Sequence, residues 1–223
     1  MGSLEGTLRI IERFFLMFFA GNKFNDIKSM CFVDYANYLH DRKNIEKAML
    51  YYNKAITLNP DNYYAYGGLA AAQTEKGSLK QALESCNKAI LIKPNVLLFI
   101  LQSIIYKYLG EPLLVEVAKQ KATELFEDKL TAYSKVADAY LKFSMYEDAE
   151  YYCKEAIKMN QNDAGLHNNL AEIFLAQQKF TEARDEFEKA LELTSDKRHK
   201  KYAIENIKKI DSVFLHMARK KYH

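Results

Sequence analysis

The strongest pattern in this 223-residue sequence is a repeat with a period of 34 residues. Four copies carry an alanine, then an aromatic residue or a cysteine four positions later, and a second alanine three positions after that. The three slots hold Ala48, Ala82, Ala149 and Ala183, then Tyr52, Cys86, Cys153 and Phe187, then Ala55, Ala89, Ala156 and Ala190. A fixed period of this length is typical of helical hairpins stacked in a row, in which neighbouring repeats share one core.

Each copy predicts two helices separated by a short break. Apolar residues recur at helical spacing before the break, as in Phe32, Tyr35, Ala36 and Leu39, and again after it. Two antiparallel helices approach to about 8–10 Å only where the residues between them are small. The alanines therefore predict closely packed hairpins.

The sequence resembles the tetratricopeptide repeat family, through Tyr35-Ala36, Leu39, Ala48, Tyr52, Ala55 and Pro60 in the first copy and their counterparts in later ones. The resemblance implies an all-α fold, a right-handed superhelix of hairpins over residues 29–197. Five repeats are expected, at 29–62, 63–96, 97–129, 130–163 and 164–197. The third repeat is divergent, because it is one residue short and has Glu111-Pro112 at its break.

Residues 1–28 predict an extra N-terminal helix that is in phase with the second helices of the array. It is apolar around most of its circumference, which favours burial against something else. Self-association through Phe14, Phe15, Phe18 and Phe19 is one expectation. Coverage by sequence outside this chain, insertion into a groove, and contact with a membrane surface are the alternatives.

Residues 198–223 predict a basic capping helix. Ala203, Ile207, Ile210, Phe214 and Met217 form one apolar stripe, and the other faces are polar. Residues 196–223 hold nine Lys or Arg and three acids, a net charge of about +6. The charges indicate either a solvated face or docking to an anionic partner, nucleic acid or lipid.

The rest of the composition argues against catalysis. The five histidines are scattered, and no Cys-x-x-Cys pair, phosphate-binding loop or dinucleotide-binding motif occurs. We therefore expect no enzyme, no metal and no cofactor. The net charge of +3 does not by itself indicate a nucleic-acid or membrane partner. Three cysteines without a disulfide pattern favour a reducing, cytoplasmic setting.

The resemblance also implies a concave groove lined by the first helix of each repeat. The expected groove residues are Asn37, His40, Tyr64, Glu75, Leu98, Leu101, Ile105, Tyr108, Asp138, Asn168 and Glu172. The acids favour a basic segment, and the stretch from Leu98 to Tyr108 favours an apolar anchor. Val33, Gly68 and Ala71 stand where the family's carboxylate-gripping members need charged or amide groups. The sequence thus predicts a non-catalytic scaffold that binds peptide or helical segments of other proteins.

Overall fold

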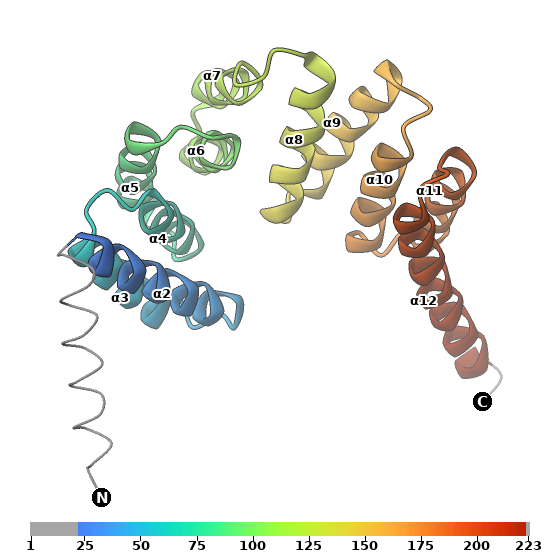
Figure 1. Ribbon diagram of the computed structural model, residues 1–223, viewed down its shortest axis with the longest axis horizontal. Helices are drawn as coiled ribbons and strands as arrows, with labels where there is room; N and C mark the ends of the chain where they lie inside the picture. The colour runs from blue at the N-terminus through green and yellow to red at the C-terminus, as the bar shows by residue number, and fades with distance from the viewer. Residues whose placement is uncertain (1–21, 222–223) are drawn as a thin grey trace, which may run out of the picture. The chain divides into compact units, whose positions relative to one another are not determined.

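The structure is a computed structural model, and it describes residues 22–221. Within that range the chain forms eleven α-helices and no strand, which confirms the all-α prediction. Figure 1 shows the helices following one another as hairpins. Their bounds are α2 Asn22–Asp41, α3 Ile45–Leu58, α4 Tyr63–Glu75, α5 Leu79–Ile92, α6 Val96–Leu109, α7 Pro112–Thr123, α8 Lys129–Lys142, α9 Tyr146–Met159, α10 Ala164–Ala176, α11 Phe180–Leu193 and α12 Lys197–Lys221.

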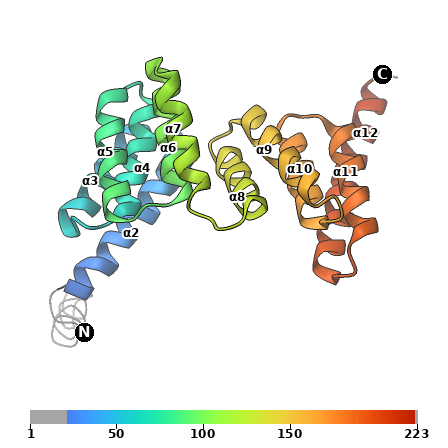
Figure 2. The same cartoon turned by 90° about the horizontal axis from the view of Figure 1, so that it is seen from above.

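The chain divides into two compact units, residues 1–118 and 119–223, and the boundary falls inside α7. Unit 1 contains the hairpins α2–α3 and α4–α5, followed by α6 and the start of α7. Unit 2 contains the hairpins α8–α9 and α10–α11, followed by α12. Within each unit, α4 packs on α3, α6 on α5, α10 on α9 and α12 on α11. Figure 2 shows the same succession from a second direction.

All five hairpins turn in the same way. One residue between the two helices has a positive φ, and the next residue donates its backbone N–H to a carbonyl five positions upstream. This is the hydrogen-bond pattern of a Schellman motif, which satisfies carbonyls left free at a helix end. The positive-φ residues are Lys43, Gly77, Gly110, Ser144 and Gln178, spaced by 34 residues except for the short third repeat. The predicted breaks are therefore one recurring turn, with glycine in only two of its five copies.

The start of each later first helix has a side-chain cap. Asn62, Asn95, Asp128 and Asp163 each accept a hydrogen bond from a backbone N–H of the following helix. Such a cap satisfies one of the free N–H groups of the first turn, a contribution of about 1 kcal/mol. The four caps fix where α4, α6, α8 and α10 begin.

The alanines form the core between the two helices of each hairpin, as predicted. Every alanine of the two alanine slots is fully buried, and so are their partners on the first helices, Ala36, Ala70, Ala137 and Ala171. In the divergent third repeat, Ala118 and Ala122 of α7 are fully buried. Val115 and Lys119, which stand in two of the repeating slots there, are only half-buried.

The two ends differ in part from the prediction. The predicted boundary at residues 28 and 29 is not a break, because α2 runs without interruption from Asn22 to Asp41. Phe14, Phe15, Phe18 and Phe19 lie outside the described residues, so self-association through them stays a prediction. The C-terminal helix α12 buries Ala203 and Ile210, but Met217, at the end of the predicted stripe, is exposed.

Candidate functional site

The expected binding residues all lie on first helices, spread over both units. Unit 1 holds Asn37 and His40 on α2, Tyr64 and Glu75 on α4, and four residues of α6. Unit 2 holds Asp138 on α8 and Asn168 and Glu172 on α10. Each unit therefore carries its own set of candidate residues.

In unit 1 the structure brings two predicted residues together across neighbouring first helices. His40 Nε2 lies 3.0 Å from Glu75 Oε1, and Lys43 Nζ lies 3.2 Å from Glu75 Oε2. Asn37 instead accepts a hydrogen bond of 2.6 Å from the Tyr52 hydroxyl of its own hairpin. Tyr64 is about half exposed. Because Glu75 already faces two basic side chains, unit 1 presents little acidic surface here.

The predicted apolar anchor on α6 is not available. Leu98, Leu101 and Ile105 are 5%, 3% and 0% exposed, so they belong to the core. Only Tyr108, 61% exposed, faces solvent. The sequence did not reveal this burial as such, because α6 is apolar on nearly all sides. A helix of that kind is buried rather than half-exposed.

In unit 2 two predicted acids occupy the same slot of consecutive repeats. Asp138 Oδ1 accepts a hydrogen bond of 3.3 Å from Asn169 Nδ2 on α10, and Glu172 accepts one from the Tyr202 hydroxyl on α12. Each acid therefore reaches the next first helix, and its hydrogen-bond donor is neutral. The sequence reading missed Asn169 and Tyr202, since their positions follow no repeat slot.

The electrostatics of Asp138 show what these two acids favour. Burial raises the pKa of Asp138, and the nearby Glu172 carboxylate raises it further, while Lys135 and Lys142 oppose both effects. The Lys135 ammonium is 3.8 Å away, at the outer limit of an ion pair. The protein thus gives the ionised form of Asp138 too few stabilising contacts to offset its burial. A cation placed between Asp138 and Glu172 would stabilise that form.

Asn168 lies one helical turn before Glu172 on α10 and is buried. Among the described residues its side-chain oxygen is one of two buried polar atoms that accept no hydrogen bond. An unsatisfied buried acceptor costs about 1–3 kcal/mol. Because the Asn168 oxygen is enclosed by the protein, it offers no hydrogen bond to a ligand at the surface, and its place in a binding site stays a prediction.

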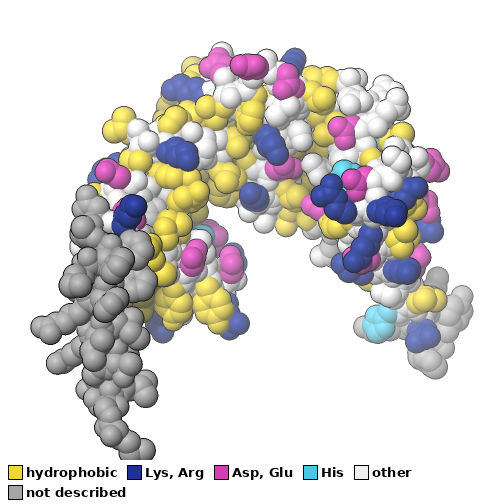
Figure 3. All heavy atoms as spheres, in the orientation of Figure 1, with side chains coloured by type: hydrophobic (Ala, Val, Ile, Leu, Met, Phe, Trp, Pro, Cys, Tyr) yellow, Lys and Arg dark blue, Asp and Glu magenta, His cyan; other side chains and the backbone are white. Residues whose placement is uncertain are grey.

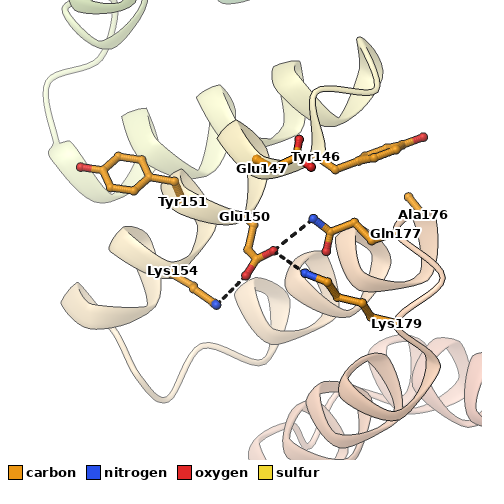
Figure 4. Close-up of a pocket in the computed structure, with 8 residues that line it drawn as sticks. All are labelled: Tyr146, Glu147, Glu150, Tyr151, Lys154, Ala176, Gln177 and Lys179. Atoms are coloured by element: carbon orange, nitrogen blue, oxygen red, sulfur yellow. Dashed lines mark hydrogen bonds and ion pairs between the residues drawn. The ribbon is translucent and has the colours of Figure 1, made fainter.

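A second feature of unit 2 is a cavity of about 650 Å³ between α9 and the end of α10. Figure 4 shows Glu150 at its centre, with Lys154 on one side and Gln177 and Lys179 on the other. Burial works to raise the pKa of Glu150, but hydrogen bonds from these three donors outweigh it and lower the pKa. The carboxylate is therefore fully engaged, and it joins α9 to the turn after α10 rather than offering a free ligand group.

A buried ion pair elsewhere in unit 2 could be mistaken for catalytic machinery. His167 Nδ1 lies 2.6 Å from Glu186 Oε2, and His167 Nε2 lies 3.0 Å from the Gln161 carbonyl oxygen. Both ring nitrogens therefore have a hydrogen-bond partner within the protein. The pair lies in the core and holds α10 against α11, a structural role that the sequence reading missed.

Between residues 22 and 221, no three His, Cys, Asp or Glu side chains are grouped as a metal site would need. In the same range, no helix has the length and apolar character needed to cross a membrane.

Comparison with known proteins identifies the repeat. Two tetratricopeptide repeat models match the chain, one at residues 39–100 and one at 135–197. Stress-induced-phosphoprotein 1 of Caenorhabditis elegans is 25% identical over 197 residues, which cover 73% of this chain and 61% of that protein. Anaphase-promoting complex subunit 7 of Homo sapiens is 25% identical over 178 residues, which cover 78% of this chain and 31% of that protein. The chain thus spans less than two thirds of the length of either relative.

Solved structures of similar fold include the tetratricopeptide repeat protein YrrB, with a TM-score of 0.43 and 22% identity over 78% of this chain and 90% of that one. Pseudomonas aeruginosa PilF gives a TM-score of 0.48 and 16% identity over 87% of this chain and 92% of that one. Because one family match lies in each unit and together they cover more than half of the chain, this chain belongs to the tetratricopeptide repeat family.

Proposed function

We propose that this chain is a non-catalytic interaction scaffold that binds a basic peptide or helical segment of a partner protein along the first helices of unit 2. The observation that carries the proposal is the pair formed by Asp138 and Glu172. The two acids repeat at the same slot and accept hydrogen bonds from neutral donors, and the Glu172 carboxylate adds to burial in raising the pKa of Asp138.

The chemistry of the ligand follows from these groups. A Lys or Arg side chain between the two carboxylates would form charge-assisted hydrogen bonds, which are about twice as strong as neutral ones. One relative supports a role in protein–protein interaction, since it is by its name a subunit of a protein complex.

The test compares basic and acidic peptide mixtures of equal length by fluorescence anisotropy. The variant Asp138→Asn/Glu172→Gln removes both charges with little change of shape. Its matched control, Glu182→Gln/Asp185→Asn, removes two exposed charges from α11 in the same unit. We expect basic peptides to bind the wild type and the control, and to lose roughly tenfold or more in affinity with the double site variant.

Two results would overturn the proposal. Acidic peptides that bind as tightly as basic ones would exclude recognition by the acids. Equal affinity of the site variant and the control would place binding elsewhere on the chain.

The basic helix α12 remains the source of a second prediction, namely binding to an anionic partner. Lys200, Lys201, Lys208 and Lys209 are exposed along it. Phosphate contacts make affinity fall steeply as salt rises. A nucleic-acid or anionic-vesicle titration whose affinity does not change with salt would remove this candidate.

A further inference from the structure

The first helix α2 exposes a face that its counterparts bury. Counted from the positive-φ residue of each hairpin, the slots 12, 8 and 5 residues upstream hold Cys31, Tyr35 and Tyr38 in α2. Tyr35 is 46% and Tyr38 is 49% exposed, and Cys31 is exposed too. In the four later hairpins, eleven of the twelve residues at these slots are buried, and the twelfth, Gln102, is half-buried.

The later repeats show what normally covers this face. The second helix of the preceding repeat packs on it, as α3 does on α4, α5 on α6 and α9 on α10. The contact is direct, because Cys86 Sγ lies 3.3 Å from the Leu98 carbonyl oxygen and Cys153 Sγ lies 3.5 Å from that of Leu166. Leu98 and Leu166 occupy the same slot as Cys31. The face of α2 is therefore shaped to receive a helix.

The chain just upstream of α2 is not arranged as it is before the other first helices. In the later repeats, a break such as Asn59–Asn62 separates each second helix from the first helix that follows. The equivalent residues 25–28 are helical and belong to α2. The turn that brings the preceding helix onto this face in the later repeats is therefore not present at residues 25–28.

The exposed face is apolar and continuous. Ile27, Met30 and Cys31 lie on it ahead of Tyr35 and Tyr38, at the spacing of one helical stripe. Tyr35 packs edge-on against Tyr51 of α3, with ring centroids 4.7 Å apart. Figure 3 shows hydrophobic side chains gathered on the surface of the α2–α3 hairpin. Exposed tyrosines in such a stripe are typical of protein interfaces.

The charges on this stripe are arranged symmetrically about Tyr38. Asp34 lies one turn before it, and the Arg42 guanidinium, from the residue just after α2, stacks on the Tyr38 ring at 4.5 Å. Asp34 is exposed, and the described residues provide it with no ion pair within 4.0 Å. In an antiparallel pair of α2 helices centred on Tyr38, Asp34 of each copy falls opposite Arg42 of the other.

From this arrangement we infer that two copies of the chain associate through the α2 face, with Tyr38 near the two-fold axis and two reciprocal Asp34–Arg42 ion pairs. A two-fold interface uses the same patch on both copies, so each residue pair occurs twice. The association is a property of unit 1 and is independent of the basic-segment binding proposed for unit 2.

The test uses the full chain and its native reporter, Cys31, which lies on the face. The rate of Cys31 alkylation and the sedimentation coefficient are measured over a range of protein concentrations. We expect alkylation to slow and sedimentation to rise together as the dimer forms. Asp34→Arg or Arg42→Asp alone should weaken dimerisation roughly tenfold or more, and the double variant Asp34→Arg/Arg42→Asp should restore it.

Tyr108→Glu provides a matched control, because Tyr108 is an exposed tyrosine on another first helix of unit 1. It should dimerise like the wild type, whereas Tyr38→Glu should not dimerise. Circular dichroism checks that every variant is folded.

Three outcomes would overturn the inference. Cys31 protected equally at every concentration would mean that another segment of the same chain covers the face. A chain that stays monomeric with a reactive Cys31 at every concentration would show that the α2 face does not bind a second copy. Concentration-dependent association with reactive Cys31, unaffected by the Asp34 and Arg42 variants, would place self-association on another surface.

Discussion

The ring of Tyr52 fills the space next to Gly68 on the neighbouring helix. A Cβ atom added at Gly68 would lie 2.3 Å from Tyr52 Cε1, far inside van der Waals contact. Tyr52 has little room to withdraw, because it is almost fully buried and its hydroxyl donates a hydrogen bond to Asn37. The stacking of α4 on α3 therefore depends on a glycine at this one position.

This contact predicts that alanine substitutions at two adjacent glycines change stability by different amounts. Replacing glycine by alanine inside a helix normally stabilises it by about 1 kcal/mol. At Gly67 the added Cβ meets only the end of the Leu98 side chain, at 3.0 Å, so Gly67→Ala should be close to neutral. Gly68→Ala should destabilise by about 1–3 kcal/mol, the usual cost of overpacking. Urea denaturation of the two variants measures the difference, and equal stability would contradict the packing described.

The recurring turn predicts three stabilising substitutions. Lys43, Ser144 and Gln178 adopt a positive φ, which costs a residue with a Cβ roughly 1–2 kcal/mol. Replacing each by glycine removes that cost, partly offset by the greater entropy of glycine in the unfolded chain. We expect each variant to gain about 0.5–1 kcal/mol.

Gly77→Ala is the control for this prediction. Its Cβ would meet no atom within 4 Å, so any loss of stability comes from the backbone alone. Thermal unfolding of all four variants should give gains at the first three positions and a loss at Gly77. A gain at Gly77 would show that the turn does not require the left-handed conformation.

The cysteines differ in reactivity because of burial. Burial raises the pKa of Cys86 to about 12, and burial with Asp138 and Glu186 nearby raises that of Cys153 to about 12. The thiolate is the reactive form, and a three-unit rise lowers its fraction about a thousandfold. At low protein concentration we expect iodoacetamide to modify Cys31 only, with the other two thiols reacting after denaturation. Mass spectrometry of the labelled peptides reads this out, and rapid labelling of Cys86 in the native protein would contradict its place in the core.

The contact between His167 and Glu186 predicts that a conservative substitution of Glu186 lowers the free energy of unfolding. The Glu186 carboxylate has hydrogen-bond partners in both His167 and Lys189, and losing a hydrogen bond to a charged group costs about 1.5–3 kcal/mol. Glu186→Gln keeps the shape of the side chain but removes its charge. The exposed pair of Arg184 and Glu188 is the control, since Glu188→Gln should cost only about 0–1 kcal/mol. Chemical denaturation measures the loss of unfolding free energy for both variants. Similar losses would contradict a larger stabilising contribution from the buried pair.

Much of the fold was predictable because small residues recur at fixed positions of the repeat. Ala48, Ala82, Ala149 and Ala183 recur in phase, and close helix packing is the physical reason for an alanine at each of those positions. The turn conformation was not predictable at Lys43, Ser144 and Gln178, because no residue type there signals a positive φ. The local backbone hydrogen bonds that close the turn accompany it instead, and they do not depend on the residue type.

The candidate site was predictable only in part, for a similar reason. Asp138 and Glu172 follow the repeat, so their common slot could be read from the sequence. Asn169 and Tyr202 donate to them from the next first helix, and that reach depends on how two helices are set side by side. Burial of Leu101 and Ile105 also depends on packing, because α6 is apolar on both its inner and outer faces.

The measurement that tests the proposed function most directly is a comparison of stability and binding for Asp138→Asn. The pKa of Asp138 is raised in the folded protein, so folding favours its protonated form, and the ionised form lowers stability as pH rises through that pKa. Asn mimics the protonated form, so at neutral pH the variant should unfold at a higher temperature than the wild type while binding basic peptides more weakly. A variant that is less stable and binds more weakly would instead show Asp138 to be structural, and unchanged affinity would contradict the acidic recognition site.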